Sequence, residues 1–225
     1  MKRVITTTQI VARESYKYLI GSGLVLALAT HWGFGAVSML LLCLAAACVI
    51  YFFRNPERIS EDDSGDAITS PSDGVIVSID REYEDTLLKE ECVSVTIATS
   101  LQDAHFVRAP FASTFRQKSS LHGLFLPVKS EKAKYLNERF AAYFEGDNGK
   151  NYMLSIIAGS LSTKISLYKP EDSKIRNAER IAFLKSEFQT TLYLPRDVSI
   201  KKAVGDKVKA GESLLGYFVS QYDKN

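Results

Sequence analysis

A long apolar segment lies near the N-terminus of the chain. Residues 18–53 contain no Asp, Glu, Lys or Arg, and only the polar and glycine-containing stretch 30–35 interrupts the run. The apolar residues before and after this stretch would form α-helices of roughly 18 and 27 Å, against a hydrocarbon core of about 30 Å. We therefore predict a membrane-embedded helical hairpin, with helices over 18–29 and 36–53, that either dips into one leaflet or spans the bilayer twice.

Positive charge flanks this segment on both outer sides. Residues 1–58 hold six basic and two acidic residues, so with a total net charge of +2 the remainder carries −2. Because basic residues mark the cytoplasmic side of a membrane segment, both ends are expected in the cytoplasm. The alternative, a cleaved signal peptide, does not suit a segment this long. The sequence thus predicts a protein of the cell membrane whose soluble domain, residues 59–225, lies on the cytoplasmic side of an N-terminal part, residues 1–58.

Beyond residue 58 the pattern changes to short runs rich in β-branched and aromatic residues, bounded by Gly, Pro, Asp or Asn. Such runs predict strands, and they cover residues 74–79, 93–97, 152–157, 163–168, 190–194 and 214–219. One helix is predicted over 130–143. The expected fold is a mainly β (α+β) soluble domain resembling a barrel-sandwich hybrid, in which residues 70–79 and 204–219 contribute related strand–turn elements.

Composition and motifs exclude several classes of function. A net charge of +2 is too small to indicate a nucleic-acid-binding protein. The three cysteines form no CxxC pair, and two of them lie in the apolar segment, so neither disulfides nor a cysteine metal site is expected. A site of three histidines would require His31 from the apolar segment, so no metal site is predicted. No Walker A, GxSxG, HExxH or EF-hand pattern is present.

Four short strings carry candidate chemistry. Asp73, in SPSDG, suits an Asx-stabilised turn. His105, in QDAHFVRAP, has the residue type of a general acid or base and lies near a carboxylate. His122, in LHGLF, allows the same two interpretations, a chemical role or a structural one. The glycine turns of residues 204–216 resemble those of lipoyl and biotinyl domains, but no modifiable lysine lies at such a turn, so we interpret them as structural.

Taken in order, the strings of this chain resemble the short, membrane-anchored form of phosphatidylserine decarboxylase. The similarity covers about residues 10–219 and is carried by FFRNPER, SPSDG, SLQDAHFVRAP, HGLF, YLNER, SIIAG, ERIAFLK, TTLYLP and AVGDKVKAGESLLGYF. It implies a role in phospholipid biosynthesis, where the family makes phosphatidylethanolamine. The implied partners are a phospholipid membrane and an aminophospholipid headgroup. Arg108, Arg116 and Lys118 are candidate contacts for the lipid phosphate, with ordinary solvated charges as the alternative.

The resemblance also implies a cofactor that the family makes from its own chain. A proenzyme breaks a Gly-Ser bond, and the serine becomes an N-terminal pyruvoyl group, which takes up the electrons released when carbon dioxide leaves. Asp73 and His105 match the family's acid and histidine, so the resemblance implies acid–base roles for both. Val107 stands where short-form members usually have Asn, which is a departure in the polar cluster.

The larger departure lies at the cleavage site. Counting from Arg180 forward and from Pro195 back, Ser186, Glu187 and Phe188 stand where the family has Phe-Gly-Ser. Phe188 carries no hydroxyl to attack the preceding carbonyl, and Glu187 lacks the conformational freedom of glycine. The pyruvoyl group is therefore not expected to form by the family's route. Ser186 could replace the nucleophile only by moving about 6–7 Å along a strand.

Three hypotheses follow. The first is a family member that recognises an aminophospholipid but does not build its pyruvoyl group. The second is a working decarboxylase that uses Ser186 or another serine. The third is a non-catalytic, membrane-tethered partner subunit, in a homo-oligomer or paired with an active homologue. For a retained site, Asp73 and His105 are expected to approach each other and the turn at residues 186–188.

Overall fold

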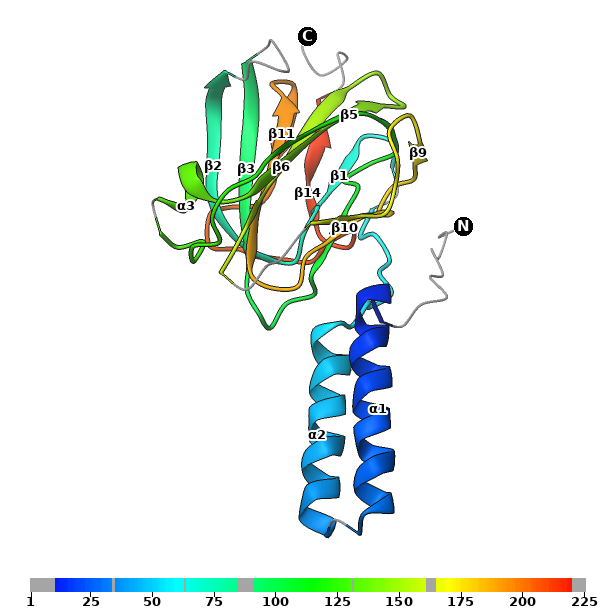
Figure 1. Ribbon diagram of the computed structural model, residues 1–225. Helices are drawn as coiled ribbons and strands as arrows, with labels where there is room; N and C mark the ends of the chain where they lie inside the picture. The colour runs from blue at the N-terminus through cyan, green and yellow to red at the C-terminus, as the bar shows by residue number, and fades with distance from the viewer. Residues whose placement is uncertain are drawn as a thin grey trace. The chain divides into compact units, whose positions relative to one another are not determined.

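The computed structural model describes residues 11–33, 35–62, 64–84, 91–130, 132–160 and 165–219 (Figure 1). The chain divides into two compact units, and the division falls between Glu57 and Arg58. The first unit is helical and the second is built from strands.

The helical unit contains a short 3₁₀-helix, η1 (Arg13–Ser15), and two α-helices, α1 (Tyr16–His31) and α2 (Ala36–Phe52). Leucine and alanine, which favour helices, dominate α2. The first helix ends just before Gly33, whose φ of +72° suits a glycine that follows a helix. The backbone N–H of Ala12 donates to the carbonyl of Phe53 at 2.9 Å, so the two ends of the unit are adjacent.

Among the described residues, no helix combines the length and the apolar character that crossing a membrane requires. The prediction of a hairpin that spans the bilayer twice therefore finds no support in these helices. Most large apolar side chains of α1 and α2 are nevertheless exposed on the unit, including Ile20, Leu24, Leu28, Val37, Leu40, Leu41 and Leu44.

The second unit is mainly β, as the sequence predicted. Its elements are β1 (Ala67–Thr69), β2 (Gly74–Glu84), β3 (Glu91–Thr99), β4 (Phe106–Arg108), β5 (Ser113–Leu121), α3 (Ala133–Leu136), β6 (Arg139–Gly146), β7 (Asn151–Ala158), β8 (Ser166–Leu167), β9 (Lys174–Ile175), β10 (Arg180–Phe183), β11 (Phe188–Pro195), β12 (Val198–Ile200), β13 (Lys207–Val208) and β14 (Leu214–Phe218). An eight-stranded sheet has the order β13-β2-β3-β11-β7-β6-β5-β9. Two three-stranded sheets, β1-β14-β12 and β4-β10-β8, accompany it. The pairings between these strands are antiparallel.

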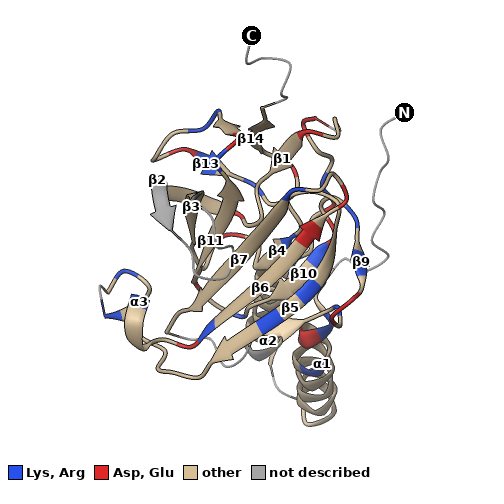
Figure 2. Cartoon of the chain, turned by 90° about the horizontal axis from the view of Figure 1, so that it is seen from above, with Lys and Arg blue, Asp and Glu red and all other residues tan. Residues whose placement is uncertain are grey.

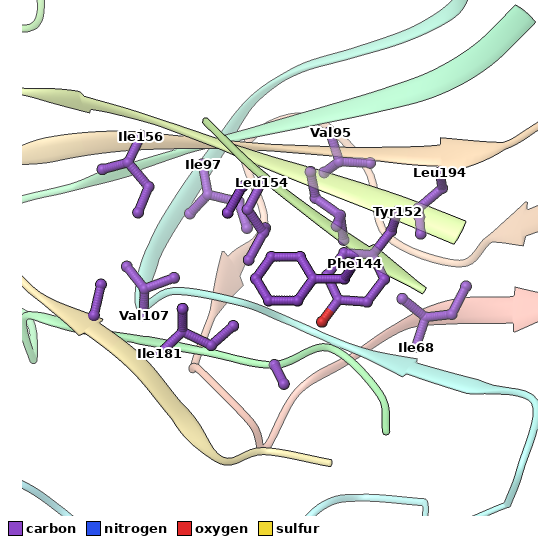
Figure 3. Packing of buried hydrophobic residues seen from close by; sticks show 14 of the residues in the cluster. Ile68, Val95, Ile97, Val107, Phe144, Tyr152, Leu154, Ile156, Ile181 and Leu194 are labelled. Carbon is purple, nitrogen blue, oxygen red and sulfur yellow. The ribbon is translucent and has the colours of Figure 1, made fainter. Parts of the chain in front are cut away.

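The hydrophobic core lies between the sheets and follows the alternation of the strands (Figure 3). Along β11, every second residue is buried, which is the period-two pattern of a strand with one inward face. Phe144 and Tyr152 stack with ring centroids 4.7 Å apart. The Tyr152 hydroxyl lies 2.9 Å from the hydroxyl of Ser113. Burial raises the pKa of the Tyr152 phenol above its ordinary value.

Replacing Tyr152 with Phe is expected to lower the free energy of unfolding by about 1 kcal/mol at pH 7, because the buried Ser113 hydroxyl loses its partner. The wild type should also lose stability above a pH of about 10, since the unfolded chain then releases the phenol proton before the folded chain does. Urea unfolding between neutral and alkaline pH measures both effects. Parallel pH profiles for the two proteins would contradict this assignment.

The predicted helix over 130–143 is wrong in most of its length. Among the described residues of this range, only Ala133–Leu136 is α-helical, and strand β6 already begins at Arg139. The inward side chains of β6 are Phe140, Ala142 and Phe144, whose spacing of two is that of a strand. Pairing with β5 and β7 on both sides overrides the helix propensity of the alanines.

The strand predicted over 163–168 corresponds to β8, which covers Ser166–Leu167, and residues 163–164 lie outside the described residues.

The two strand–turn elements that the sequence singled out pair with each other. Strand β1 pairs with β14, and β2 pairs with β13, so the turn before β2 and the turn before β14 lie together. Gly74 opens β2 with φ of +143°, and a Cβ there would lie 2.1 Å from the carbonyl oxygen of Ala98. Only glycine fits this close approach of two strands. The turn before β2 contains Asp73, so this pairing sets the position of the candidate site.

Candidate functional site at one end of the eight-stranded sheet

Four strands of the large sheet place their ends together. Phe188, the first residue of β11, pairs with Thr99 at the end of β3 and with Ala158 at the end of β7. On the next strand, Val75 of β2 pairs with Ala98. Because neighbouring strands are antiparallel, the turn 70–73, the turn 100–103 and the segment 184–188 meet at this end of the sheet.

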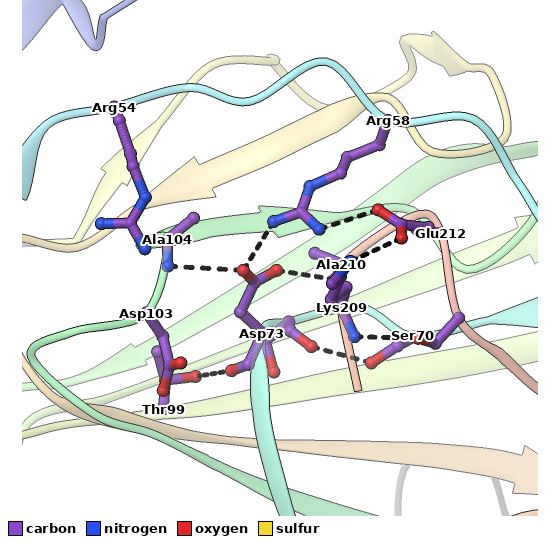
Figure 4. A network of polar contacts seen from close by, with 12 residues as sticks. Arg54, Arg58, Ser70, Asp73, Thr99, Asp103, Ala104, Lys209, Ala210 and Glu212 are labelled. Atoms are coloured by element: carbon purple, nitrogen blue, oxygen red, sulfur yellow. Dashed lines mark hydrogen bonds and ion pairs between the residues drawn. The ribbon is translucent and has the colours of Figure 1, made fainter. Parts of the chain in front are cut away.

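Asp73 is buried, and its carboxylate joins several segments (Figure 4). Oδ1 accepts a hydrogen bond from the backbone N–H of Ala210 at 2.7 Å. Oδ2 accepts from Arg58 Nη2 at 2.7 Å and from the N–H of Ala104 at 3.4 Å. The backbone carbonyl of Asp73 accepts from the Thr99 hydroxyl at 2.6 Å. The carboxylate thus holds the turns of the site in place, which is more than the local Asx turn that the sequence favoured.

Arg58 is a site residue that sequence reasoning missed. Its guanidinium bridges two carboxylates, with Nη2 2.7 Å from Asp73 Oδ2 and Nη1 2.9 Å from Glu212 Oε2. Lys209 also binds Glu212, at 2.8 Å. Burial opposes the ionisation of Glu212, but the hydrogen bonds from Lys209 and Arg58 outweigh it and lower its pKa. The only signal in the sequence was the positive charge of Arg58 in FFRNPER, which by itself does not indicate a carboxylate partner.

His105 lies between the Asp73 turn and the segment 184–188. It is almost fully buried, and its Nε2 lies 3.3 Å from the carbonyl oxygen of Ser100. Its own carbonyl accepts a hydrogen bond from the N–H of Leu184 at 3.2 Å. The imidazole ring faces Phe188 with centroids 6.4 Å apart. Since Asp73 binds the residue before His105, the structure places Asp73, His105 and Phe188 at one site.

The segment 184–188 crosses from β10 to β11 in contact with the end of β7. The carbonyl of Glu187 accepts a hydrogen bond from the N–H of Gly159 at 3.0 Å, and a Cβ on Gly159 would lie 2.4 Å from that oxygen. The Ser160 hydroxyl donates to the Glu187 carboxylate at 2.9 Å. Ser186 and Phe188 are both fully buried, on either side of the partly exposed Glu187.

These residues do not fit the family's route to a pyruvoyl group. That route needs a hydroxyl at the first residue of β11, and this position is filled by the buried ring of Phe188. The carbonyl that would be attacked, that of Glu187, is already hydrogen-bonded to Gly159. At the first residue of β11 the chain thus presents a ring carbon where the route implied by the resemblance needs a hydroxyl oxygen. Ser186, the candidate substitute, precedes this carbonyl instead of following it.

The three candidate phosphate contacts do not form one cluster. Arg108 of β4 is buried at the site. Its backbone N–H donates to the carbonyl of Pro71 at 2.8 Å, and its Nη1 donates to the carbonyl of Ala178 at 3.0 Å. Burial, together with Arg58 and Arg180, lowers the pKa of Arg108 to about 10, while Asp73 opposes the shift. Arg116 and Lys118 instead lie on exposed positions of β5 (Figure 2).

The other residues that the sequence analysis singled out lie in ion pairs or in the core. Arg116 is held by Glu145 and Asp172, at 2.7 and 3.2 Å. Val107, which the resemblance marked as a departure in the polar cluster, is buried in the core and pairs with Ala182. His122 is exposed, with Nδ1 3.7 Å from Glu138. Among the described residues, no group of three metal-ligating side chains is found.

Comparison with known proteins gives one family. The family model described as phosphatidylserine decarboxylase matches residues 45–216. The chain is 31% identical over 208 residues to the phosphatidylserine decarboxylase proenzyme of Syntrophus aciditrophicus, covering 92% of this chain and 97% of that protein. The proenzyme of Desulfotalea psychrophila is 29% identical over 209 residues, with 93% and 97% covered. That of Nitrosomonas europaea is 30% identical over 209 residues, with 93% and 95% covered.

Proposed function

Because the chain belongs to the phosphatidylserine decarboxylase family, which acts in phospholipid biosynthesis, we propose that it binds an aminophospholipid headgroup at the membrane without cutting itself. The observation that carries this proposal is the ring of Phe188, which packs 6.4 Å from the His105 ring where self-cleavage would need a serine hydroxyl. An uncut chain holds no pyruvoyl group, so it lacks the electron sink for decarboxylation.

The support for headgroup binding is the charge at the site. Arg58 and Arg180 lie close enough to Arg108 to lower its pKa, and Asp73 is the carboxylate that opposes this shift. Such a group of guanidinium ions favours a ligand that carries phosphate or carboxylate. In this proposal Arg108 donates to the headgroup, Asp73 keeps the arginines and turns in place, and His105 borders the bound headgroup.

The support for membrane association is the surface of the helical unit. Large apolar side chains are exposed along α1 and α2, while basic residues flank the two helices. With 16 and 17 residues, the helices measure about 24 and 26 Å, less than the hydrocarbon core of about 30 Å. They are therefore proposed to enter one leaflet, with residues 59–225 on the cytoplasmic side.

Intact-mass measurement of the purified full chain tests the proposal. A single species of 25.0 kDa is expected, together with no carbon dioxide release from phosphatidylserine. Vesicles containing phosphatidylserine should bind the protein more tightly than phosphatidylcholine vesicles, and Arg108→Met should reduce this preference. A C-terminal fragment of residues 186–225 with a ketone at its new end would instead establish a decarboxylase that uses Ser186.

The partner-subunit hypothesis has its own outcome in the same preparation. Co-purification of a homologue that contains the Gly-Ser pair would indicate that the chain works beside an active enzyme. A single uncut species that binds phosphatidylserine alone supports the headgroup-binding function.

A further inference from the structure

The last residue of β5 and the connection from β5 to β6 present four large apolar side chains to solvent. The exposed fractions are 55% for Leu121, 55% for Leu124, 77% for Tyr135 and 47% for Leu136. The two arms of the connection are joined, since the N–H of Leu124 donates to the carbonyl of Leu136 at 2.7 Å. We term these four residues the loop patch. Single exposed apolar residues are ordinary, but a group of four between positions 121 and 136 indicates an interaction surface.

Lysines surround the loop patch. Lys129, Lys132 and Lys134 are all exposed on the same connection, and Figure 2 shows basic positions at α3 and in the turn before it. Of the two acidic residues here, Glu138 is mostly buried near His122, and Glu131 lies outside the described residues. Exposed leucine and tyrosine ringed by lysine is the composition of a surface that rests on an anionic membrane.

The loop patch is fixed to the end of the sheet that carries the candidate site. Buried Asn137, next to Leu136, donates from Nδ2 to the carbonyl of Ala158 at 2.8 Å and to that of Leu126 at 2.7 Å. Ala158 pairs with Phe188, and the adjacent Gly159 binds the Glu187 carbonyl. The end of β5, the start of β6 and the site therefore share one end of the sheet.

We propose that the loop patch contacts the surface of an anionic phospholipid bilayer, with its apolar side chains at the boundary of headgroups and acyl chains and its lysines at the phosphates. This contact would hold the bilayer next to the segment 184–188. A protein partner fits less well, because lysine is depleted in protein interfaces and the described part of this connection exposes three lysines, Lys129, Lys132 and Lys134. The inference rests on the proposed function and adds a second point of membrane contact, outside the helices.

The chain's single tryptophan allows a direct test on the full-length protein. Trp32→Phe removes the native fluorophore, and Tyr135→Trp then places a probe in the loop patch. With vesicles of phosphatidylcholine and phosphatidylserine that carry brominated acyl chains, emission from position 135 should shift to shorter wavelength and fall by about half. A matched probe, Lys174→Trp, lies on β9 beside Thr114 at the opposite end of the sheet and should remain unquenched.

Charge-reversal variants distinguish the effect of the three lysines beside the loop patch from the effect of the protein's net charge. The change Lys129→Glu, Lys132→Glu and Lys134→Glu should abolish quenching at position 135. The control introduces the same number of reversals away from the loop patch, at Lys207 on the edge strand β13 and at Lys201 and Lys202 in the segment between β12 and β13, and should leave quenching intact. Equal losses in both variants would show that total charge alone acts, and would overturn the inference.

Vesicle flotation distinguishes failure of this inference from failure of the proposed function. Protein that floats with vesicles while position 135 is no more quenched than position 174 would overturn the loop contact and leave membrane association standing. Protein that does not float would overturn both. A shift at position 135 that needs no vesicles and grows with protein concentration would show that another copy of the chain covers the patch, which also overturns the proposal.

Discussion

Changing Ser186, Glu187 and Phe188 to Phe, Gly and Ser is expected to convert an uncut chain into one that cleaves itself between residues 187 and 188. The change supplies the hydroxyl at the first residue of β11, where the ring of Phe188 now faces His105. It also exchanges Phe and Ser between two buried positions of one short segment, so the total side-chain volume there changes little.

The surroundings that such a serine needs are present. The carbonyl of residue 187 already accepts a hydrogen bond from Gly159 at 3.0 Å, the length at which a backbone N–H stabilises a developing oxyanion. His105, whose ring lies 6.4 Å from that of Phe188, is the expected acceptor for the proton of the attacking hydroxyl. Glycine at position 187 also removes the Glu187 side chain, whose Cγ lies close to Gly159.

Intact mass again provides the measurement. The triple variant should yield a fragment of residues 188–225 with a blocked, ketone-bearing N-terminus. The matched control carries Ser186→Phe, Glu187→Gly and Phe188→Ala, which lacks only the hydroxyl, and should remain whole. Adding His105→Ala to the triple variant should slow cleavage by about a hundredfold. A triple variant that unfolds cooperatively like the wild type, yet stays uncut, would mean that the site has lost more than one oxygen.

Arg58→Ala is expected to lower the free energy of unfolding by about 3 kcal/mol, because it leaves the buried carboxylate of Asp73 without its counter-ion. The side chains of Arg58 and Asp73 are each only 9% exposed, and the second carboxylate of the bridge, Glu212, is 29% exposed. Loss of the guanidinium also removes the ion pair to Glu212, which lies in the turn before β14. The same turn contains Ala210, whose N–H donates to Asp73, so two contacts that hold this turn are weakened together.

Arg116→Ala is the matched control for this change. Arg116 also bridges two carboxylates, but its side chain is 46% exposed and those of Glu145 and Asp172 are 51% and 77% exposed. Surface pairs of this kind contribute little, so no measurable loss is expected. Urea unfolding of both variants provides the measurement, with Arg58→Lys expected to recover part of the stability. Equal losses in the two alanine variants would show that the buried bridge is not a structural support of the site.

Membership of the family was predictable from the sequence, and so was the departure of the residue types at the expected cleavage site. The order of the short strings indicated phosphatidylserine decarboxylase, and the absence of a hydroxyl at Phe188 is a property of the residue type. Strands such as β11 were predictable because a sheet with one buried face requires apolar residues at every second position. The same local reasoning failed for residues 130–143, where the spacing of apolar residues suited a helix weakly and strand pairing decided the outcome.

Only the tertiary structure determined which side chains meet. The bridge from Arg58 to Asp73 and Glu212, the hydrogen bond from Gly159 to Glu187, and the separation of Arg108 from Arg116 and Lys118 all depend on strand register between segments far apart in the chain. Residue types and local periodicity carry information about chemistry and about single strands. Contacts across a sheet arise from burial and pairing of the whole chain, so the arrangement of the site could be known only once the sheets were formed.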